Sequence, residues 1–574
     1  MITAEMQRIL LLVAMAATAY LLVLAWNDDY IKGRNVPGAS SSPVATAPES
    51  SSPDSFAEAN EAPKAGSGTK DSSGAKSSDA TSTAVAPTVS GASGNGRLIR
   101  VTTGAMQLWI DPHGGDITRV QLPRYPVSID KPDDPFLLLD KRADHTYIAE
   151  SGLIGRDGLD VNGNRPTYEF DGNDVNLPNG GEVRLKTSVG GDIQVDKFFK
   201  FTADDYVVDV GYEIANHSDR TLEVKQFGQL KRDNRDLSAG SSYTLGPKPY
   251  LGAALSTNNE RYHKLTFKAI DEQPYRETVT GGWIAMLQHY FISAWVANPK
   301  EENYFYGQKR EDGDYVVGFS GPAETVAPGT TAHLSSRFYA GPKDQGRLEA
   351  IAPNLNLTVD YGFLWWLAVP LFQLLKWLHS VVGNWGFAII LLTLIVKLVL
   401  YPLSAASYRS MANMRRVAPQ MKRLQERYAD DRQKLSQEMM NFYKKEKINP
   451  LGGCLPMVLQ MPVFISLYWV LFESVELRQA PFLFWIRDLA VMDPFFVLPI
   501  LMGGSMYLTQ ALSPTMPDPV QARVMKFMPV MFTVMFLFFP AGLVLYWLVN
   551  NVLSIAQQWF ITRQIEGGAN AVKS

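Results

Sequence analysis

The chain has 574 residues, of which 46% are hydrophobic and 19% charged, and its formal net charge is −3. A charge so close to balance gives no global attraction to nucleic acid, so no direct nucleic-acid partner is expected. The single cysteine, Cys454, excludes an intrachain disulfide and a zinc site built on thiolates. The length predicts two or three domains, and an exported domain without disulfides needs a large core of its own.

Residues 1–30 predict an N-terminal transmembrane anchor. An apolar run of 18 residues, 9–26, follows Arg8 and is near the lower limit for crossing a hydrocarbon core. A cleaved signal peptide is the alternative, but Leu24-Ala25-Trp26 is a poor cleavage site for a signal peptidase. Residues 31–96 are rich in Ser, Ala, Pro and Gly, a composition that predicts a flexible linker.

Residues 97–350 predict a large antiparallel β-sandwich, which we expect in the periplasm. Short runs such as 207–214 and 222–227 alternate apolar and polar residues, and turn signals such as Asp171-Gly172-Asn173 separate them. The histidines of this region show no spacing typical of ligands, so we expect neither a metal site nor a catalytic site there.

Six apolar runs follow the sandwich. Aromatic and polar insertions in 357–382 favour an amphipathic helix that lies in the membrane interface. The other five have about the length of a spanning helix. With the anchor, they predict a bundle of six transmembrane helices. The expected spans are 384–403, 452–475, 494–512, 524–540 and 541–563; a periplasmic loop at 476–493, a cytoplasmic loop at 513–523 and a cytoplasmic tail at 564–574 complete the region.

Residues 404–450 predict a cytoplasmic helical hairpin. Eleven Lys and Arg stand against five acidic residues, which marks a cytoplasmic loop. If the sandwich lies outside, one crossing separates it from this loop, so both termini are expected in the cytoplasm. An apolar seam for two antiparallel helices recurs at spacings of three and four. Its members are Met414, Val417, Met421, Leu424 and Tyr428, then Leu435, Met439 and Phe442.

The outer face of this hairpin is strongly basic. It carries the candidate docking residues Arg415, Arg416, Lys422, Arg423 and Arg427. Two interpretations stay open. One is a solvated charged face beside anionic lipid. The other is a docking site for the ribosome, targeting factors or the nascent chain.

Lys397 lies inside the apolar run 384–403, where a charged side chain costs roughly 2.5–3.5 kcal/mol on insertion scales. One explanation is that its amine extends to the headgroups, because Leu403 is only about 9 Å further along the helix. The other is a polar cavity in the cytoplasmic half of the bundle. Thr393, Gln460 and Asn550 favour the cavity, because polar groups in lipid are costly unless they face one another or water.

Several long motifs resemble the YidC insertase family of Gram-negative bacteria. They are Asn384-Trp385-Gly386-Phe387, Tyr401-Pro402-Leu403, the run 449–456, the run 460–464, Ser474-Val475-Glu476-Leu477-Arg478-Gln479-Ala480-Pro481-Phe482, and the run 539–547. The resemblance covers the whole membrane region, and the order of anchor, linker and exported domain is similar too. The sandwich is assigned by its position in the chain and not by a motif.

The resemblance implies a hydrophilic, positively charged groove that is open to the cytoplasm and to lipid. Lys397 takes the place of a cation that is often Arg, so it keeps the charge but loses the bidentate fork. Thr393 falls near it, and Trp547 stands where relatives often have Tyr. A client helix is expected to slide along four residues: Met461, Phe464, Met502 and Met535. Without the resemblance, plain lipid-facing or core packing is the preferred explanation of these four.

The predicted function is therefore that of a membrane protein insertase and chaperone of the bacterial inner membrane, acting alone or with the Sec translocon. Its expected partners are nascent membrane proteins and the phospholipid bilayer. No catalytic motif, metal site or cofactor is expected, so the chain is not predicted to be an enzyme. Two alternatives stay open: a transporter for a small anion, and an envelope enzyme or sugar-binding protein whose site lies in the sandwich.

Overall fold

The computed structural model describes residues 97–161, 164–172, 174–235, 249–428, 431–446, 455–512 and 519–571. The predicted anchor (1–30) and linker (31–96) lie outside the described residues. The described residues divide into two compact units, a sandwich unit that ends at Val359 and a helical unit that begins at Asp360. Each unit is taken by itself below.

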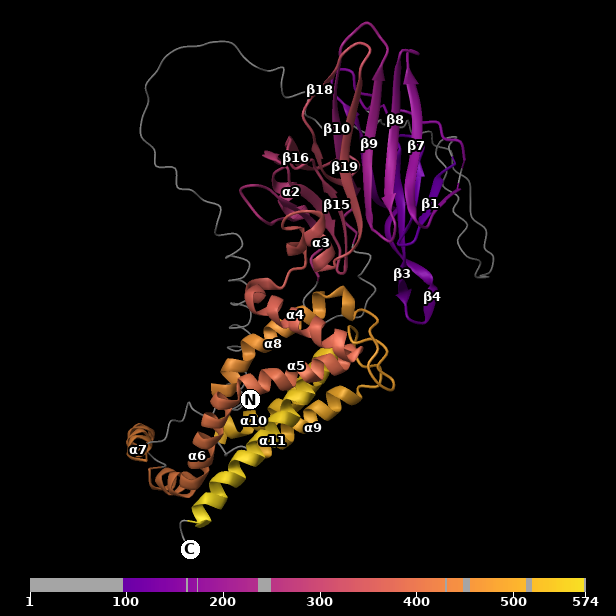
Figure 1. The fold of residues 1–574 in the computed structure, drawn as a ribbon. Coiled ribbons are helices and arrows are strands. Elements are labelled where there is room, and N and C mark those ends of the chain that lie inside the picture. The colour runs from indigo at the N-terminus through magenta and orange to yellow at the C-terminus, as the bar shows by residue number, and fades with distance from the viewer. Residues whose placement is uncertain are drawn as a thin grey trace, which may run out of the picture. The chain divides into compact units, whose positions relative to one another are not determined.

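The sandwich unit consists of two facing sheets (Figure 1). An 11-stranded sheet contains β1 (Ile99–Thr103), β2 (Gln107–Asp111), β3 (Asp116–Ser128), β4 (Lys131–Arg142), β5 (His145–Ile154), β6 (Asp174–Leu177), β10 (Leu222–Arg232), β13 (Tyr275–Thr280), β16 (Glu302–Lys309), β17 (Tyr315–Ser320) and β18 (Glu324–Val326). An 8-stranded sheet contains β7 (Gly180–Val189), β8 (Ile193–Thr202), β9 (Val207–Asn216), β11 (Gly252–Ser256), β12 (His263–Leu265), β14 (Trp283–Leu287), β15 (Phe291–Val296) and β19 (Thr331–Pro342). Two short helices, α2 (Phe267–Glu272) and α3 (Gln345–Ile351), complete the unit.

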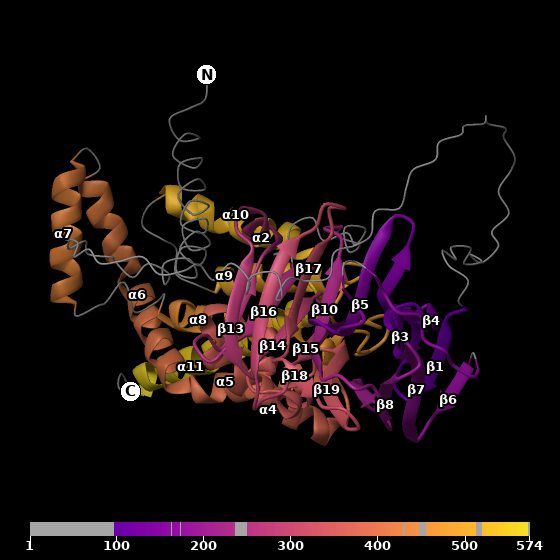
Figure 2. The same cartoon turned by 90° about the horizontal axis from the view of Figure 1, so that it is seen from above.

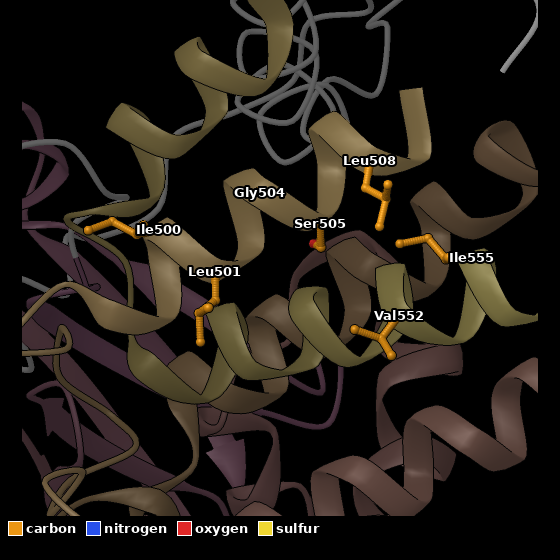
Figure 3. Close-up of a pocket in the computed structure, with 7 residues that line it drawn as sticks. All are labelled: Ile500, Leu501, Gly504, Ser505, Leu508, Val552 and Ile555. Carbon is orange, nitrogen blue, oxygen red and sulfur yellow. The ribbon is translucent and has the colours of Figure 1, made fainter. Parts of the chain in front are cut away.

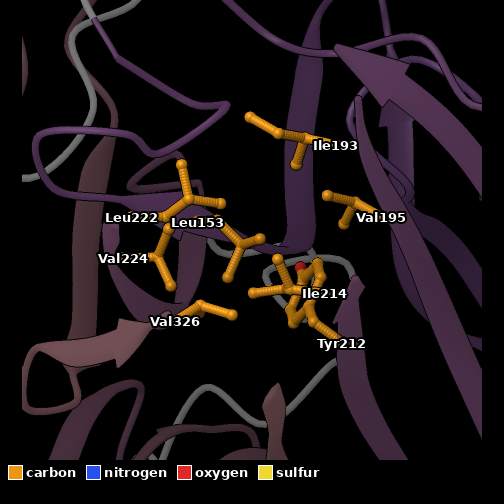
Figure 4. Close-up of a cluster of buried hydrophobic side chains, with 8 residues drawn as sticks. All are labelled: Leu153, Ile193, Val195, Tyr212, Ile214, Leu222, Val224 and Val326. Atoms are coloured by element: carbon orange, nitrogen blue, oxygen red, sulfur yellow. The ribbon is translucent and has the colours of Figure 1, made fainter. Parts of the chain in front are cut away.

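The alternation seen in the sequence places one face of each sheet in a common core. In β9, the residues Val208, Val210, Tyr212 and Ile214 are all buried, as a strand with one face in the core requires. Side chains of β8 and β9 meet those of β5, β10 and β18 from the other sheet in one apolar cluster (Figure 4). The expected sandwich is thus present. It is not purely antiparallel, because β1 pairs with β6 in parallel.

The helical unit contains α4 (Trp365–Val382), α5 (Trp385–Val399), α6 (Tyr401–Arg427), α7 (Arg432–Lys445), α8 (Leu455–Glu473), α9 (Val497–Ala511), α10 (Pro519–Phe536) and α11 (Ala541–Ala571). The long helix α11 packs against α5, α6 and α9, while α4 packs against α5 and α8. Figures 1 and 2 both show α7 alongside α6 at one edge of this unit. Their contact uses the expected seam, since Val417 and Met421 are buried against Met414, Met439 and Phe442.

Two helix boundaries differ from the sequence prediction. The helix expected from residue 357 begins at Trp365, because residues 355–358 and 362–364 form separate 3₁₀ turns and Gly362 has a φ of +65°. That backbone conformation interrupts a right-handed helix. The last helix continues to Ala571 and includes most of the predicted tail 564–574. The backbone hydrogen bonds continue the helix into the tail, although the tail has no apolar pattern.

Hydropathy and length assign no membrane span to any single helix of the described residues; α5 and α6 meet the criteria only together, as a pair bent by 67°. The six spanning helices therefore stay a prediction.

Helices α9 and α10 approach closely at Gly503. A Cβ atom at this position would lie 1.9 Å from the Thr533 hydroxyl and 3.1 Å from the Thr533 Cβ. The hydroxyl itself donates to the carbonyl of Pro529 over 2.7 Å, so rotating it away breaks a hydrogen bond. At the next residue, Gly504, a Cβ atom would meet nothing within 4 Å. A Cβ atom therefore fits at Gly504 but collides with Thr533 at Gly503.

We expect Gly503→Ala to destabilise the helical unit by about 1–3 kcal/mol, the usual cost of overpacking. Gly504→Ala is the matched control and should stabilise it by roughly 0.5–1 kcal/mol, because alanine is the better helix former. Thermal unfolding of the detergent-solubilised variants measures both. Equal melting temperatures for the two variants would contradict the close contact.

Candidate functional site

Lys397 is placed by helix α5, whose first turn is anchored at Asn384. The Asn384 side chain accepts a hydrogen bond from the Phe387 amide at 3.2 Å and donates to the Pro481 carbonyl at 3.1 Å. Such a cap satisfies an amide that the first turn leaves open. The helix then carries Lys397 in its last turn, where the residue is 4% exposed. A full positive charge is therefore buried among helices.

The amine of Lys397 donates to two neutral side chains from two other helices. Its Nζ lies 3.2 Å from Oε1 of Gln460 on α8 and 2.7 Å from Oγ of Ser554 on α11. Among the described residues, no charged side chain acts on it. The ammonium is thus hydrogen-bonded but has no counter-charge within the described residues.

Gln460 is the centre of this polar network. Its carbonyl oxygen faces Lys397, while its amide nitrogen donates to Oδ1 of Asn550 and, at 3.3 Å, to the hydroxyl of Tyr546. An amide offers both donors and acceptors, so it connects the cation to the polar face of α11. The sequence prediction that Lys397, Gln460 and Asn550 lie together agrees with this geometry.

Two other predicted groove residues lie outside the network. Thr393 is fully buried, and its hydroxyl donates to the carbonyl of Ile389 in its own helix at 2.7 Å. Trp547 is half-buried and packs edge-on against Phe464, with ring centroids 4.4 Å apart. Its indole N–H has no hydrogen-bond acceptor within the described part of the chain. Trp547 thus packs among aromatic side chains and takes no part in the hydrogen bonds around Lys397.

The four predicted client-contact residues differ in exposure. Met461 of α8 is 43% exposed and Met535 of α10 is 38% exposed. Phe464 is half-buried, one turn beyond Met461. Met502 of α9 is 0% exposed, so it offers no surface to a client in this conformation. The structure therefore brings three of the four to accessible positions.

The predicted docking face on α6 is exposed where the structure describes it. Arg416, Arg423 and Arg427 are all exposed, whereas Val417 and Met421 of the same helix are buried in the seam with α7. The side chains of Arg415 and Lys422 lie outside the described residues. A helix with one apolar and one basic face fits both interpretations given above.

Ser554 and Tyr546 are functional candidates that sequence reasoning missed. Ser554 follows Asn550 by one helical turn, so the two share a face of α11. Tyr546 precedes Asn550 by one turn on the same face. The spacing 546, 550, 554 was thus a readable signal, but a tyrosine and a serine in an apolar helix also suit ordinary packing.

A separate pocket of about 550 Å³ lies between α9 and α11 (Figure 3). Its lining is apolar and consists of Ile500, Leu501, Gly504, Ser505, Leu508, Val552 and Ile555. The one hydroxyl there, of Ser505, donates to the Met502 carbonyl and accepts from Asn551 at 3.0 Å. Such a lining suits hydrocarbon and offers no partner to a charged group, so this pocket does not share the chemistry of the Lys397 network.

The sandwich unit holds a different buried charge cluster. Arg165 pairs with Asp116 and with Asp160, and Lys197 donates to the carbonyls of Gly114 and Ser151, each at 2.9 Å. Burial raises the pKa of Asp116 to about 7 and lowers that of Lys197 to about 7. Every charged member has partners inside the protein, which favours a structural role over an enzyme's reactive centre.

Comparison with known proteins places both units in one family context. A YidC periplasmic domain model matches residues 98–374, and a 60Kd inner membrane protein model matches residues 377–568. The membrane protein insertase YidC of Stutzerimonas stutzeri strain A1501 is 50% identical over 570 residues, which cover 98% of this chain and 99% of the relative. The membrane protein insertase YidC of Azotobacter vinelandii strain DJ is 49% identical over 573 residues, with coverages of 98% and 99%.

A solved structure of an active YidC insertase, with its first transmembrane domain resolved, is also similar. It covers 80% of this chain and 94% of its own length, at 17% identity and a TM-score of 0.36.

The Arg165 cluster yields a pH-dependent prediction. Arg165→Met removes the cation that pairs directly with two buried carboxylates and leaves only Lys197 near them. Breaking a buried pair in this way typically costs about 3–5 kcal/mol. A carboxyl whose folded pKa is raised binds more protons when folded than when unfolded. Its destabilising effect is therefore absent below its unfolded pKa of about 4 and grows as the pH rises toward the folded value. We expect the loss of stability to be larger at pH 8 than at pH 5.

Hydrogen exchange of amides in β5, measured on the full-length protein in detergent at both pH values, tests this expectation. The control is Arg100→Met, which removes an exposed pair with Asp174 at 3.3 Å and should cost about 1 kcal/mol or less. A loss for Arg165→Met that does not shrink at pH 5 would contradict the assignment.

Proposed function

The chain belongs to the YidC family of membrane protein insertases, and from this premise we propose that its helical unit inserts clients through a polar groove centred on Lys397. The insertase function, the inner membrane location and the periplasmic domain are properties of the family. The proposal concerns how this chain's own residues perform the task.

The observation that carries the proposal is the set of partners around the Lys397 amine. Both are neutral oxygens, on Gln460 and Ser554. A carboxylate is a stronger acceptor for an ammonium than a hydroxyl or an amide. An acidic residue in the polar flank of a nascent segment therefore gains by displacing one of them. Coulomb attraction at 4 Å between unit charges is about 1–4 kcal/mol at effective dielectric constants between those of water and a protein surface.

The apolar part of the client then has a surface to follow. Met461 of α8 and a stripe of α10 are exposed, and this stripe comprises Phe527, Val530, Met531, Val534 and Met535. Methionine adapts to varied partners because its side chain is unbranched and polarizable. We propose that the client segment moves along this surface into lipid, driven by burial of its apolar area. Met502 joins that surface only if α9 moves.

The proposal also covers the chain termini, the basic face of α6 and the release of the client. The six predicted spans place both termini and the basic face of α6 in the cytoplasm, where Arg416, Arg423 and Arg427 meet the ribosome, targeting factors or anionic headgroups. Lipid-facing apolar side chains let the released segment stay beside the bundle, which is the basis of a chaperone role. Handover between this bundle and the Sec translocon uses the same exposed surface of α8 and α10.

Charge substitution at Lys397 tests the proposal. The assay uses proteoliposomes and a model client, an apolar segment whose short flank carries either one Asp or none, and protease protection of the flank measures insertion. Lys397→Ala should lower insertion of the acidic client roughly fivefold or more, the ratio that corresponds to about 1 kcal/mol. Lys397→Arg should retain it, because the charge remains.

Lys526→Ala is the matched control, since this lysine of α10 is exposed and should not affect either client. The client without Asp should insert equally well with every variant. If Lys397→Ala inserts the acidic client as efficiently as the original protein, the cation has no part in insertion.

A further inference from the structure

The hydroxyl of Ser554 links α5 to α11 at one oxygen atom. It accepts a hydrogen bond from the Lys397 amine of α5 at 2.7 Å and donates its own proton to the Asn550 carbonyl of α11, also at 2.7 Å. The side chain of Tyr408, from α6, lies next to the same hydroxyl. A hydroxyl has one proton and two acceptor positions. Ser554 uses its proton and one acceptor position in the two bonds to Asn550 and Lys397, which leaves one acceptor position facing the neighbouring Tyr408.

Tyr408 itself is held firmly. It is buried in a small apolar cluster with Ala405 of α6 and Ile561 of α11, against which Met411 packs. Further along the same helix, Met421 packs against α7 in the seam of the hairpin. The distance along α6 from Tyr408 to Met421 is about 20 Å at 1.5 Å per residue. Ser554 therefore lies where the hairpin-bearing helix meets the groove cation.

The long side chain of Lys397 has a competing location. A lysine near the end of an apolar helix lowers its free energy by extending toward the headgroups. The amine instead lies in the bundle, and Ser554 supplies the shorter of its two hydrogen bonds. Without that oxygen, only Gln460 holds the amine inward. The position of the positive charge across the membrane thus depends on the Ser554 hydroxyl.

We propose that Ser554 and Tyr408 are positioning residues for insertion: Ser554 fixes the depth of the Lys397 ammonium, and Tyr408 orients Ser554 from the hairpin helix α6. The inference rests on the proposed role of Lys397 in attracting acidic flanks. It adds that the depth of the charge, and not only its presence, selects which client flanks are captured. It also implies that the packing of α6 against α11 influences the depth of the Lys397 ammonium.

A depth-resolved insertion assay tests the proposal on the full chain in proteoliposomes. The probes are model clients whose single Asp is moved one residue at a time along the polar flank. Ser554→Ala should lower insertion of the best client about fivefold, the effect of deleting one hydrogen bond of roughly 1 kcal/mol. The optimum Asp position should shift along the flank, because the amine then extends toward the headgroups. Ser554→Thr should preserve both rate and optimum, because it keeps the hydroxyl.

Tyr408→Phe should give a smaller loss with the same direction of shift. Because Tyr408 acts through Ser554, the double variant Ser554→Ala with Tyr408→Phe should match Ser554→Ala alone; sites that share one partner are not additive. A client without Asp should insert normally with every variant, which shows that the bundle remains folded.

The outcomes separate this inference from the proposed function. If Lys397→Ala impairs acidic clients while Ser554→Ala changes neither rate nor optimum, the positioning role is wrong and the function of Lys397 stands. The positioning role of Ser554 is also wrong if Ser554→Thr fails to preserve the insertion rate and the optimum Asp position. The role of Tyr408 is wrong if the losses of insertion in the two single variants add up in the double variant. If Lys397→Ala inserts acidic clients normally, the proposed function itself fails.

Discussion

The function proposed for the helical unit depends on one interaction, the hydrogen bonding of a buried ammonium by neutral oxygens. Lys397 is held by Gln460 and Ser554, with no charged side chain acting on it within the described residues. A buried charge is costly unless it is paired. Hydrogen bonds without a counter-charge reduce that cost only in part, and in the proposed mechanism an incoming carboxylate relieves the rest.

In the sandwich unit, by contrast, buried charges are paired with opposite charges. There Arg165 is paired with Asp116 and Asp160, and Lys197 lies within cation–π distance of Tyr212 and Phe199, at 5.3 and 5.5 Å from the ring centroids. That cluster is complete and has no need of a ligand. Under the proposed function, the contrast distinguishes a charge network that stabilises a fold from one that binds a client.

Much of this arrangement could be predicted from the sequence. The period-two alternation in 207–214 predicted a sandwich strand, and the spacing of Val417, Met421 and Met439 predicted the hairpin seam, because side-chain direction follows directly from backbone periodicity. The proximity of Lys397, Gln460 and Asn550 was predicted on energetic grounds, since polar groups in an apolar bundle have few alternatives to one another.

The rest depended on contacts between distant segments. Met502 was expected at a client surface but is fully buried, because periodicity gives the face of a helix and not the helix that covers it. Ser554 and Tyr408 are small or common residues, and the role proposed for them arises only where α5, α6 and α11 meet. The start of α4 at Trp365 was missed because a positive φ at Gly362 cannot be read from hydropathy.

The most direct measurement is a zero-length crosslink between client and groove. A membrane-permeant carbodiimide joins a carboxylate to an amine only when the two are in contact. We expect a client stalled during insertion, with one Asp in its flank, to form an amide bond with Lys397 that mass spectrometry identifies. If the client becomes joined only to exposed lysines such as Lys526 while it inserts normally, the ammonium of Lys397 does not receive the client's negative charge.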